Sequence, residues 1–210
     1  LRTDSGRLML PFQSNVSRST TDLKLSNELK NSLTSLASKE AITFGSLLQA
    51  VWAVTLQSLG FGSTPCFGLI ISDRDPTVQG INKYVGLTIN TLPMVVDARN
   101  AHNILSIAKN VQNLFSKMQS HAEIDLPSLQ KWAHITNEPL FDTLFVLENY
   151  PRNRMSGKQI SFNSIEMIEQ AHYPMTLAVI PDDEITFRLS CNNQLITNQL
   201  AQSILRRDRK

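Results

Sequence analysis

The chain has 210 residues, of which 41% are hydrophobic and 18% are charged, and this ordinary globular composition excludes a disordered or fibrous protein. The formal net charge is only +2, and the one dense basic run lies in the last five residues, so we expect no nucleic-acid-binding surface. The apolar stretch 44–59 is interrupted by polar side chains and is too short for a membrane span, and no secretion signal precedes it.

The first half of the chain predicts an arm, two helices and a buried strand. Residues 1–25 are polar and irregular, which is typical of a linker or an extended arm. Ser26 and Thr43 are suited to cap two helices, the second apolar on nearly every side and closed by Gly60 in a left-handed conformation. The continuous apolar run 66–71 predicts a central strand that is covered on both faces.

The second half predicts more strand than helix. A polar loop (72–80) precedes an extended apolar segment (84–96), and an amphipathic helix follows at 101–119. A short helix at 126–132, a strand at 144–147 and an extended piece at 160–162 come next. Alternating segments at 175–179 and 185–191 predict a hairpin, and a last helix begins near Thr197. We therefore expect one α/β unit, a mixed β-sheet with helices packed on it.

The two cysteines and four histidines carry no recognisable chemistry. Cys66 and Cys191 lie in apolar runs, so we expect core thiols in a reducing, cytoplasmic compartment rather than a disulfide. The histidines are not at metal-ligand spacing, and the sequence contains neither a Gly-x-Ser-x-Gly elbow nor a glycine-rich phosphate loop. We therefore assign no catalytic residue and no metal ligand, and we expect no cofactor bound directly to the chain.

Two segments carry polar groups in an apolar context. The run 84–93 (YVGLTINTLP) places Gly, Asn and Thr inside an apolar strand, where buried polar groups need partners and glycine often marks a close approach. The alternative is a bulge whose polar groups are satisfied locally. The run 148–151 (ENYP) ends an apolar strand, either as a functional cluster or as a strand-terminating turn.

These segments resemble the condensation domains of non-ribosomal peptide synthetases. The run 72–74 (SDR), followed by Gly80 and the run 84–93, resembles that family's "SGRP…PG…VGLFINTLP". The run 139–151 (PLFDTLFVLENYP) resembles "LFDSLLVFENYP", 173–179 (YPMTLAV) resembles "NYPLTLAV", and 126–132 (LPSLQKW) resembles "PLADIQRW". The four segments occur in the family's order, although Asp73 stands in place of a glycine of that pattern.

The resemblance implies a fold and an activity. Such domains join an upstream acyl or peptidyl thioester to a downstream amino group, with both substrates carried on phosphopantetheine arms of carrier domains. Their fold is a V of two lobes, each like chloramphenicol acetyltransferase, a CoA-dependent acyltransferase, with a tunnel between them. The HHxxxDG catalytic motif lies in the N-terminal lobe, and this sequence contains no such motif. The chain is therefore expected to be an inter-lobe arm (1–25) and a C-terminal lobe (26–210) cut short in its last helix.

The resemblance also implies site residues and partners. Ser72, Arg74 and Asn90 fall at the tunnel, and the crossover to the other lobe involves four residues: Glu148, Asn149, Tyr150 and Tyr173. The implied partners are the N-terminal lobe, the upstream and downstream peptidyl carrier domains and an adenylation domain of the parent chain, without nucleic acid or membrane. Two alternatives stay open: a non-catalytic docking or recruitment module, and an acyltransferase of the same fold with a CoA- or carrier-bound donor.

Overall fold

The computed structural model describes residues 10, 17–72, 80, 89–99, 103–135, 138–148, 173–181 and 184–207. These residues form one six-stranded mixed sheet, in the order β1-β6-β5-β4-β2-β3. The strands are β1 (Arg18–Lys24), β2 (Cys66–Ser72), β3 (Ile89–Val95), β4 (Thr143–Leu147), β5 (Met175–Pro181) and β6 (Ile185–Asn192). The helices are α1 (Asn27–Lys39), α2 (Phe44–Ser58), α3 (Ile104–Gln119), α4 (Leu126–Trp132) and α5 (Asn198–Arg207).

The helix boundaries follow the local signals in the sequence. The Ser26 side chain accepts a hydrogen bond from the N–H of Leu29 at the start of α1, and Thr43 accepts one from Ser46 at the start of α2. Gly60 has φ +97° immediately after α2, a conformation that costs glycine little. The predicted caps and the left-handed closure are therefore confirmed.

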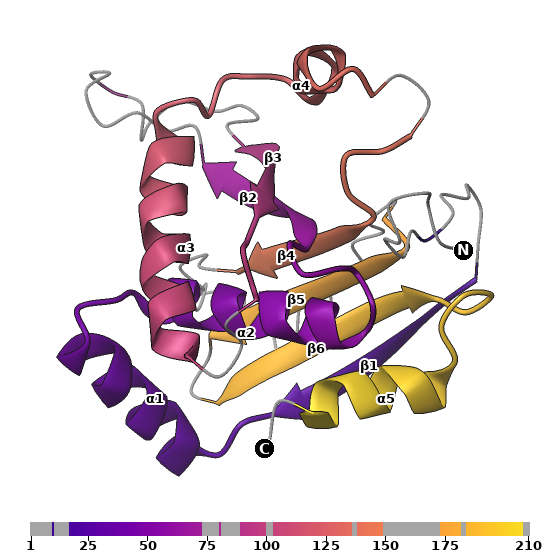
Figure 1. The fold of residues 1–210 in the computed structure, drawn as a ribbon. Coiled ribbons are helices and arrows are strands. Elements are labelled where there is room, and N and C mark those ends of the chain that lie inside the picture. The colour runs from indigo at the N-terminus through magenta and orange to yellow at the C-terminus, as the bar shows by residue number, and fades with distance from the viewer. Residues whose placement is uncertain are drawn as a thin grey trace, which may run out of the picture.

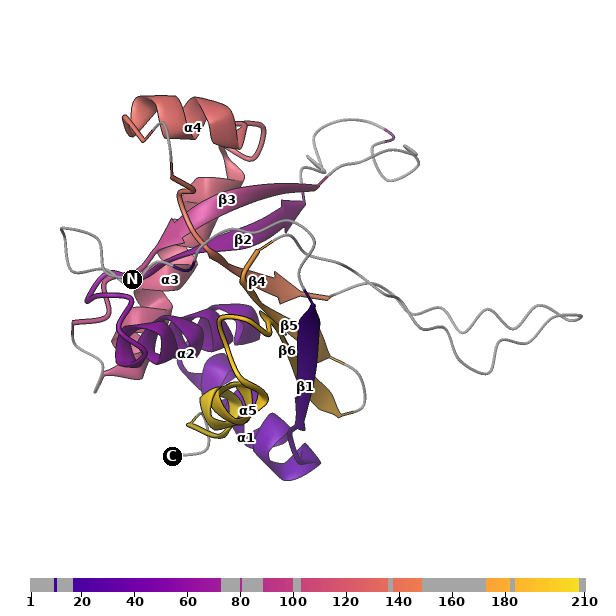
Figure 2. The same cartoon turned by 90° about the vertical axis from the view of Figure 1, so that its right-hand side faces the viewer.

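The helices bury one face of the sheet. Side chains alternate between the two faces along each strand, and one aligned row crosses five strands as core residues: Leu189, Leu177, Phe145, Leu69 and Leu92. Helix α2 packs on this face with Trp52 almost completely buried, and Figures 1 and 2 place α2, α3 and α5 on the same side of the sheet. The next aligned row, on the second face, contains Ser190, Thr176, Leu144 and Gly68.

The sheet confirms most of the predicted strands and adds one. β2 lies between β3 and β4, as expected for a central strand, and β5 and β6 form the predicted antiparallel hairpin. Residues 18–24 belong to the predicted arm and are extended, but they pair with β6 and so become the edge strand β1. The expected extended pieces at 84–88 and 160–162 lie outside the described residues.

Both cysteines are free and buried, which confirms their prediction as core residues. Burial raises the pKa of the Cys191 thiol to about 12, so this side chain stays protonated at neutral pH. No helix in the described part of the chain is long and apolar enough to cross a membrane.

Candidate functional site

Two of the predicted site residues lie toward the same end of the sheet. Ser72 ends β2 and Glu148 directly follows β4, and because these strands run parallel (Leu69 beside Phe145), their carboxyl ends point to the same end of the sheet. The backbone N–H of Glu148 donates to the carbonyl oxygen of Val179 at 2.9 Å, which continues the β4–β5 ladder. Ligands of open α/β sheets bind at the carboxyl ends of the strands, so this end of the sheet is the expected place for a binding site.

Three other predicted residues lie outside the described part of the chain. Arg74 belongs to the segment after β2, and Asn149 and Tyr150 belong to the segment after β4. The roles that the resemblance gives them therefore stay predictions, as does the role of the Ser72 side chain.

Asn90 uses its whole side chain to hold a connection between two helices. Its amide nitrogen donates to the carbonyl oxygens of Ala122 and Ile124, both at 2.7 Å, and its amide oxygen accepts from the N–H of Thr91 at 2.8 Å. The polar group in the apolar strand is thus satisfied within the chain, by the neighbouring Thr91 and by residues 122–124 of the α3–α4 connection. The pairing of β3 with β2 is regular here (Asn90 beside Ile71), so the alternative of a locally satisfied bulge is not what the structure shows at Asn90. Asn90 fastens the α3–α4 connection to β3.

Helix α4 is held at both ends and has no fully buried residue. Asn90 fixes the connection in front of it, Asp125 caps it by accepting from the N–H of Ser128 at 2.7 Å, and the Gln130 side chain donates to the carbonyl oxygen of Glu138 at 3.1 Å. The cap hydrogen bond also lowers the pKa of Asp125. Besides these polar contacts, α4 packs against the core through the partly buried Leu129.

Tyr173 lies at the other end of the sheet from Glu148. Tyr173 lies just before β5, and Glu148 directly follows β4. Because β4 and β5 are parallel (Thr143 beside Met175, Leu147 beside Val179), Tyr173 and Glu148 lie at opposite ends of the strand pair. Residues 149–172, which connect the two strands, lie outside the described part of the chain. Of the four predicted crossover residues the structure describes Glu148 and Tyr173, and the crossover role stays a prediction.

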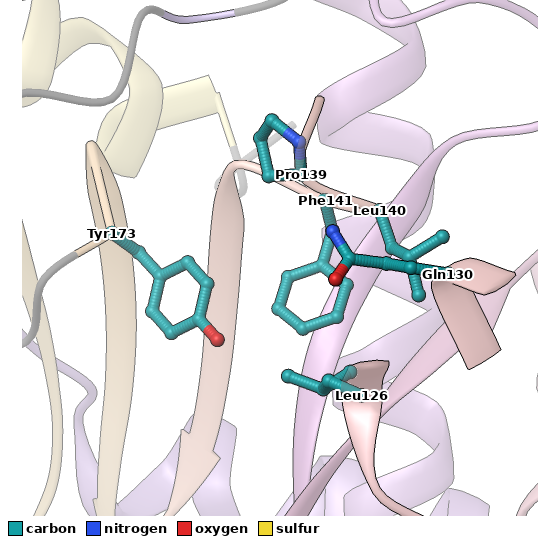
Figure 3. Close-up of a pocket in the computed structure, with 6 residues that line it drawn as sticks. All are labelled: Leu126, Gln130, Pro139, Leu140, Phe141 and Tyr173. Carbon is teal, nitrogen blue, oxygen red and sulfur yellow. The ribbon is translucent and has the colours of Figure 1, made fainter. Parts of the chain in front are cut away.

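Tyr173 lines a pocket beneath α4, here called the α4 pocket. The pocket has a volume of about 70 Å³, is open to solvent, and has six lining residues (Figure 3): Leu126, Gln130, Pro139, Leu140, Phe141 and Tyr173. The Phe141 ring stacks on the Tyr173 ring with 5.2 Å between centroids and 27° between planes. None of the six side chains is charged, and burial raises the pKa of Tyr173, so its phenol is neutral at physiological pH.

Gly68 makes room for the Phe141 ring. A Cβ at this position would lie 2.8 Å from both Cδ2 and Cζ of Phe141 and closer still to Cε2. The only signal for this contact was a glycine inside an apolar strand, which often marks close approach by another group. The roles of Gly68 and Phe141 were not predicted, because Phe141 precedes β4 and is distant from Gly68 in the sequence.

Among the described residues there is no group of three or more His, Cys, Asp or Glu side chains able to hold a metal ion. The α4 pocket offers an uncharged surface, which can position a substrate or a neighbouring protein.

Comparison with known proteins identifies the family. The model of the condensation domain matches residues 9–208. Tyrocidine synthase 2 of Brevibacillus parabrevis is 30% identical over 187 residues, which are 86% of this chain but 5% of that protein, so the chain spans a small part of this relative.

Solved structures share the fold at lower identity. The first condensation domain of the calcium-dependent antibiotic synthetase, solved in complex with a substrate analogue, matches with a TM-score of 0.74 at 12% identity. The match covers 98% of this chain and 47% of the solved chain. The complex of the X-domain and OxyB from teicoplanin biosynthesis matches with a TM-score of 0.74 at 17% identity, over 97% of this chain and 48% of the solved chain. The mixed sheet with helices is thus the expected acyltransferase-like fold, and the chain belongs to the condensation-domain family.

Proposed function

We propose that the chain is the C-terminal lobe of a peptide synthetase condensation domain and helps to position two carrier-bound substrates for amide bond formation. The observation that carries the proposal is the family match over residues 9–208, in a chain whose fold covers 47% of a solved condensation domain. A lobe of this kind is completed by a second one, and the second lobe carries the HHxxxDG motif in the family that the sequence resembles.

The reaction joins an amine to a thioester. The amino nitrogen of the acceptor forms a bond to the thioester carbonyl carbon of the donor, the carbon–sulfur bond breaks, and the thiol of the donor's phosphopantetheine arm leaves with a proton. These arms belong to the substrates rather than to this chain. Holding the two reactants in the reactive geometry is itself able to supply about 7–11 kcal/mol of the barrier reduction.

The end of the sheet at Ser72 and Glu148 is the proposed tunnel side of this lobe, and the same proposal includes Arg74, Asn149 and Tyr150 on the strength of the resemblance. The support is the parallel register of β2 and β4, which puts the carboxyl ends of both strands at this end of the sheet. We assign Asn90 a supporting role there, since its side chain holds the α3–α4 connection.

The proposed partners follow from the same role. They are the N-terminal lobe, the upstream and downstream peptidyl carrier domains, and an adenylation domain in the parent protein. Tyrocidine synthase 2, of which this chain matches 5%, is a protein large enough to contain such domains.

A second candidate function is a docking module without condensation activity. It is favoured by the fold similarity to the X-domain, whose solved structure is a complex with OxyB. An acyltransferase with a CoA-bound donor is a third possibility, and an adenylation domain in the parent protein would argue against it.

The test is a condensation assay with the intact domain, meaning this chain together with the lobe that precedes it. Donor and acceptor carrier proteins are loaded with thioesters, and the acceptor is analysed by mass spectrometry. The proposal predicts the amide product on the acceptor carrier. Binding of carriers or other proteins without product would instead support the docking module, and product from a free CoA thioester would support the third possibility.

A further inference from the structure

Arg18 makes an unusually complete set of contacts for a residue on an edge strand. Its Nε donates to the hydroxyl of Ser190 at 3.1 Å, one terminal nitrogen donates to the carbonyl oxygen of Tyr173 at 2.8 Å, and the other donates to the carbonyl oxygen of Ser190 at 3.2 Å. The guanidinium therefore reaches from β1 across β6 to the residue that precedes β5. Arginine is suited to this because its donors are fixed in one plane.

The environment of Arg18 differs from that of a surface ion pair. The side chain is partly buried, burial lowers its pKa, and the three acceptors of its guanidinium described above are neutral oxygen atoms. Arg188, also on the second face of the sheet, instead pairs with the exposed Asp22 through contacts of 3.0 and 2.9 Å. Exposed pairs of that kind contribute little to stability, so Arg188 provides a matched control.

The contact of Arg18 with Tyr173 leads to the α4 pocket. Tyr173 stacks on Phe141 and forms one wall of the pocket, and the Phe141 ring in turn fills the space above Gly68. Contacts thus run across the second face from β1 through β6, the start of β5 and the start of β4 to β2. The bond from Arg18 to its carbonyl oxygen holds the backbone of Tyr173, next to Pro174, whose own carbonyl oxygen accepts from the N–H of Asn192 at 2.9 Å.

We propose that Arg18 is a positioning residue, which holds Tyr173 so that its ring forms the wall of the α4 pocket. The inference rests on the proposed function in one respect, namely that a correctly formed lobe is needed for condensation. It adds a specific connection between the N-terminal arm and this pocket.

The experiment compares Arg18→Ala, Arg18→Lys and Arg188→Ala in the intact domain. The ring signals of isotope-labelled tyrosine are recorded by NMR, with Tyr173 assigned from the signal that Tyr173→Phe removes. The same proteins are assayed for kcat and KM with loaded carriers, at a temperature where thermal melts show each to be folded.

The expected result is that Arg18→Ala moves the Tyr173 signal toward that of an unstacked tyrosine and lowers kcat/KM by roughly 10- to 100-fold, the range typical of a misplaced positioning group. Arg18→Lys should retain part of both, because one ammonium group is still able to bind the Tyr173 carbonyl oxygen. Arg188→Ala should change neither.

Two results would overturn the inference: an unmoved Tyr173 signal in Arg18→Ala, or a moved signal with unchanged kcat/KM. A wild-type domain that forms no amide would refute the proposed function instead. The Tyr173 signal alone would then decide whether Arg18 positions the pocket wall.

Discussion

Replacing Gly68 by alanine places a methyl group where the ring of Phe141 lies. The new Cβ would lie 2.8 Å from two ring carbons and closer to a third, and Phe141 is only 2% exposed and stacked on Tyr173. The ring therefore cannot turn away without losing this stacking and changing the α4 pocket.

The expected loss of stability follows from two opposing effects. Overpacking a buried site costs about 1–3 kcal/mol. Alanine is otherwise favoured over glycine inside a strand by roughly 0.5–1 kcal/mol, so the net loss for Gly68→Ala is about 1 kcal/mol and at most about 2.5 kcal/mol. Gly45→Ala in α2 is the control, since its Cβ would meet only the flexible Leu147 side chain at 3.2 Å and alanine is also favoured over glycine in a helix, so we expect no loss of stability.

The assay is urea denaturation of the wild-type chain, the control Gly45→Ala, the single variants Gly68→Ala and Phe141→Leu, and the double variant Gly68→Ala/Phe141→Leu. If the methyl group acts through the ring, the smaller side chain at 141 should relieve the strain, and the two substitutions should couple by at least about 0.5 kcal/mol. Equal stability of Gly68→Ala and the wild type, or strictly additive effects, would refute the packing argument.

Three further predictions concern the residues that shape the chain. Asn90→Ala should cost about 1–3 kcal/mol of stability and speed backbone hydrogen exchange across 120–135, because two carbonyl groups lose their donor. In the intact domain we expect the activity to fall by more than the loss of folded protein explains. A folded fraction that keeps full activity would contradict this second expectation. The hydrogen bond from Ser128 lowers the pKa of Asp125 in the folded chain. The helix cap that Asp125 provides is therefore fully present above the ordinary pKa of 3.8 and is lost as the pH falls through the lower pKa of the folded chain. Hydrogen exchange of the Ser128 N–H should rise at that pH in the wild type and not in Asp125→Asn. With its pKa near 12 in the folded chain, Cys191 should resist alkylation at pH 8 until urea unfolds the protein, as mass spectrometry of labelled peptides would show.

The sequence predicted the elements whose signals are local. Ser26 and Thr43 bond to backbone groups three residues away, and the alternation in 175–191 belongs to two adjacent strands. Family resemblance then supplied what periodicity does not, the acyltransferase-like fold. That Ser72 and Glu148 lie toward the same end of the sheet followed only from the register of β2 and β4.

The contacts that shape the candidate site join distant parts of the chain, and no local pattern marks them. Strand β1 is polar because it forms an edge, so only its pairing with β6 identifies it as a strand. Arg18 and Ser190 are 172 positions apart, and Asn90 binds carbonyl groups 32 and 34 positions away. The sequence showed that Asn90 needed partners, while the fold determined which ones.

The central claim is that this chain is one lobe of a two-lobed condensation domain. The most direct measurement is amide formation from loaded donor and acceptor carriers by the chain alone, by the preceding lobe alone, by a mixture of the two and by the covalently intact domain. We predict product from the intact domain, at most partial recovery in the mixture, and none from the chain alone. Product from the isolated chain, or no product from an intact domain with an unaltered HHxxxDG motif, would contradict the account.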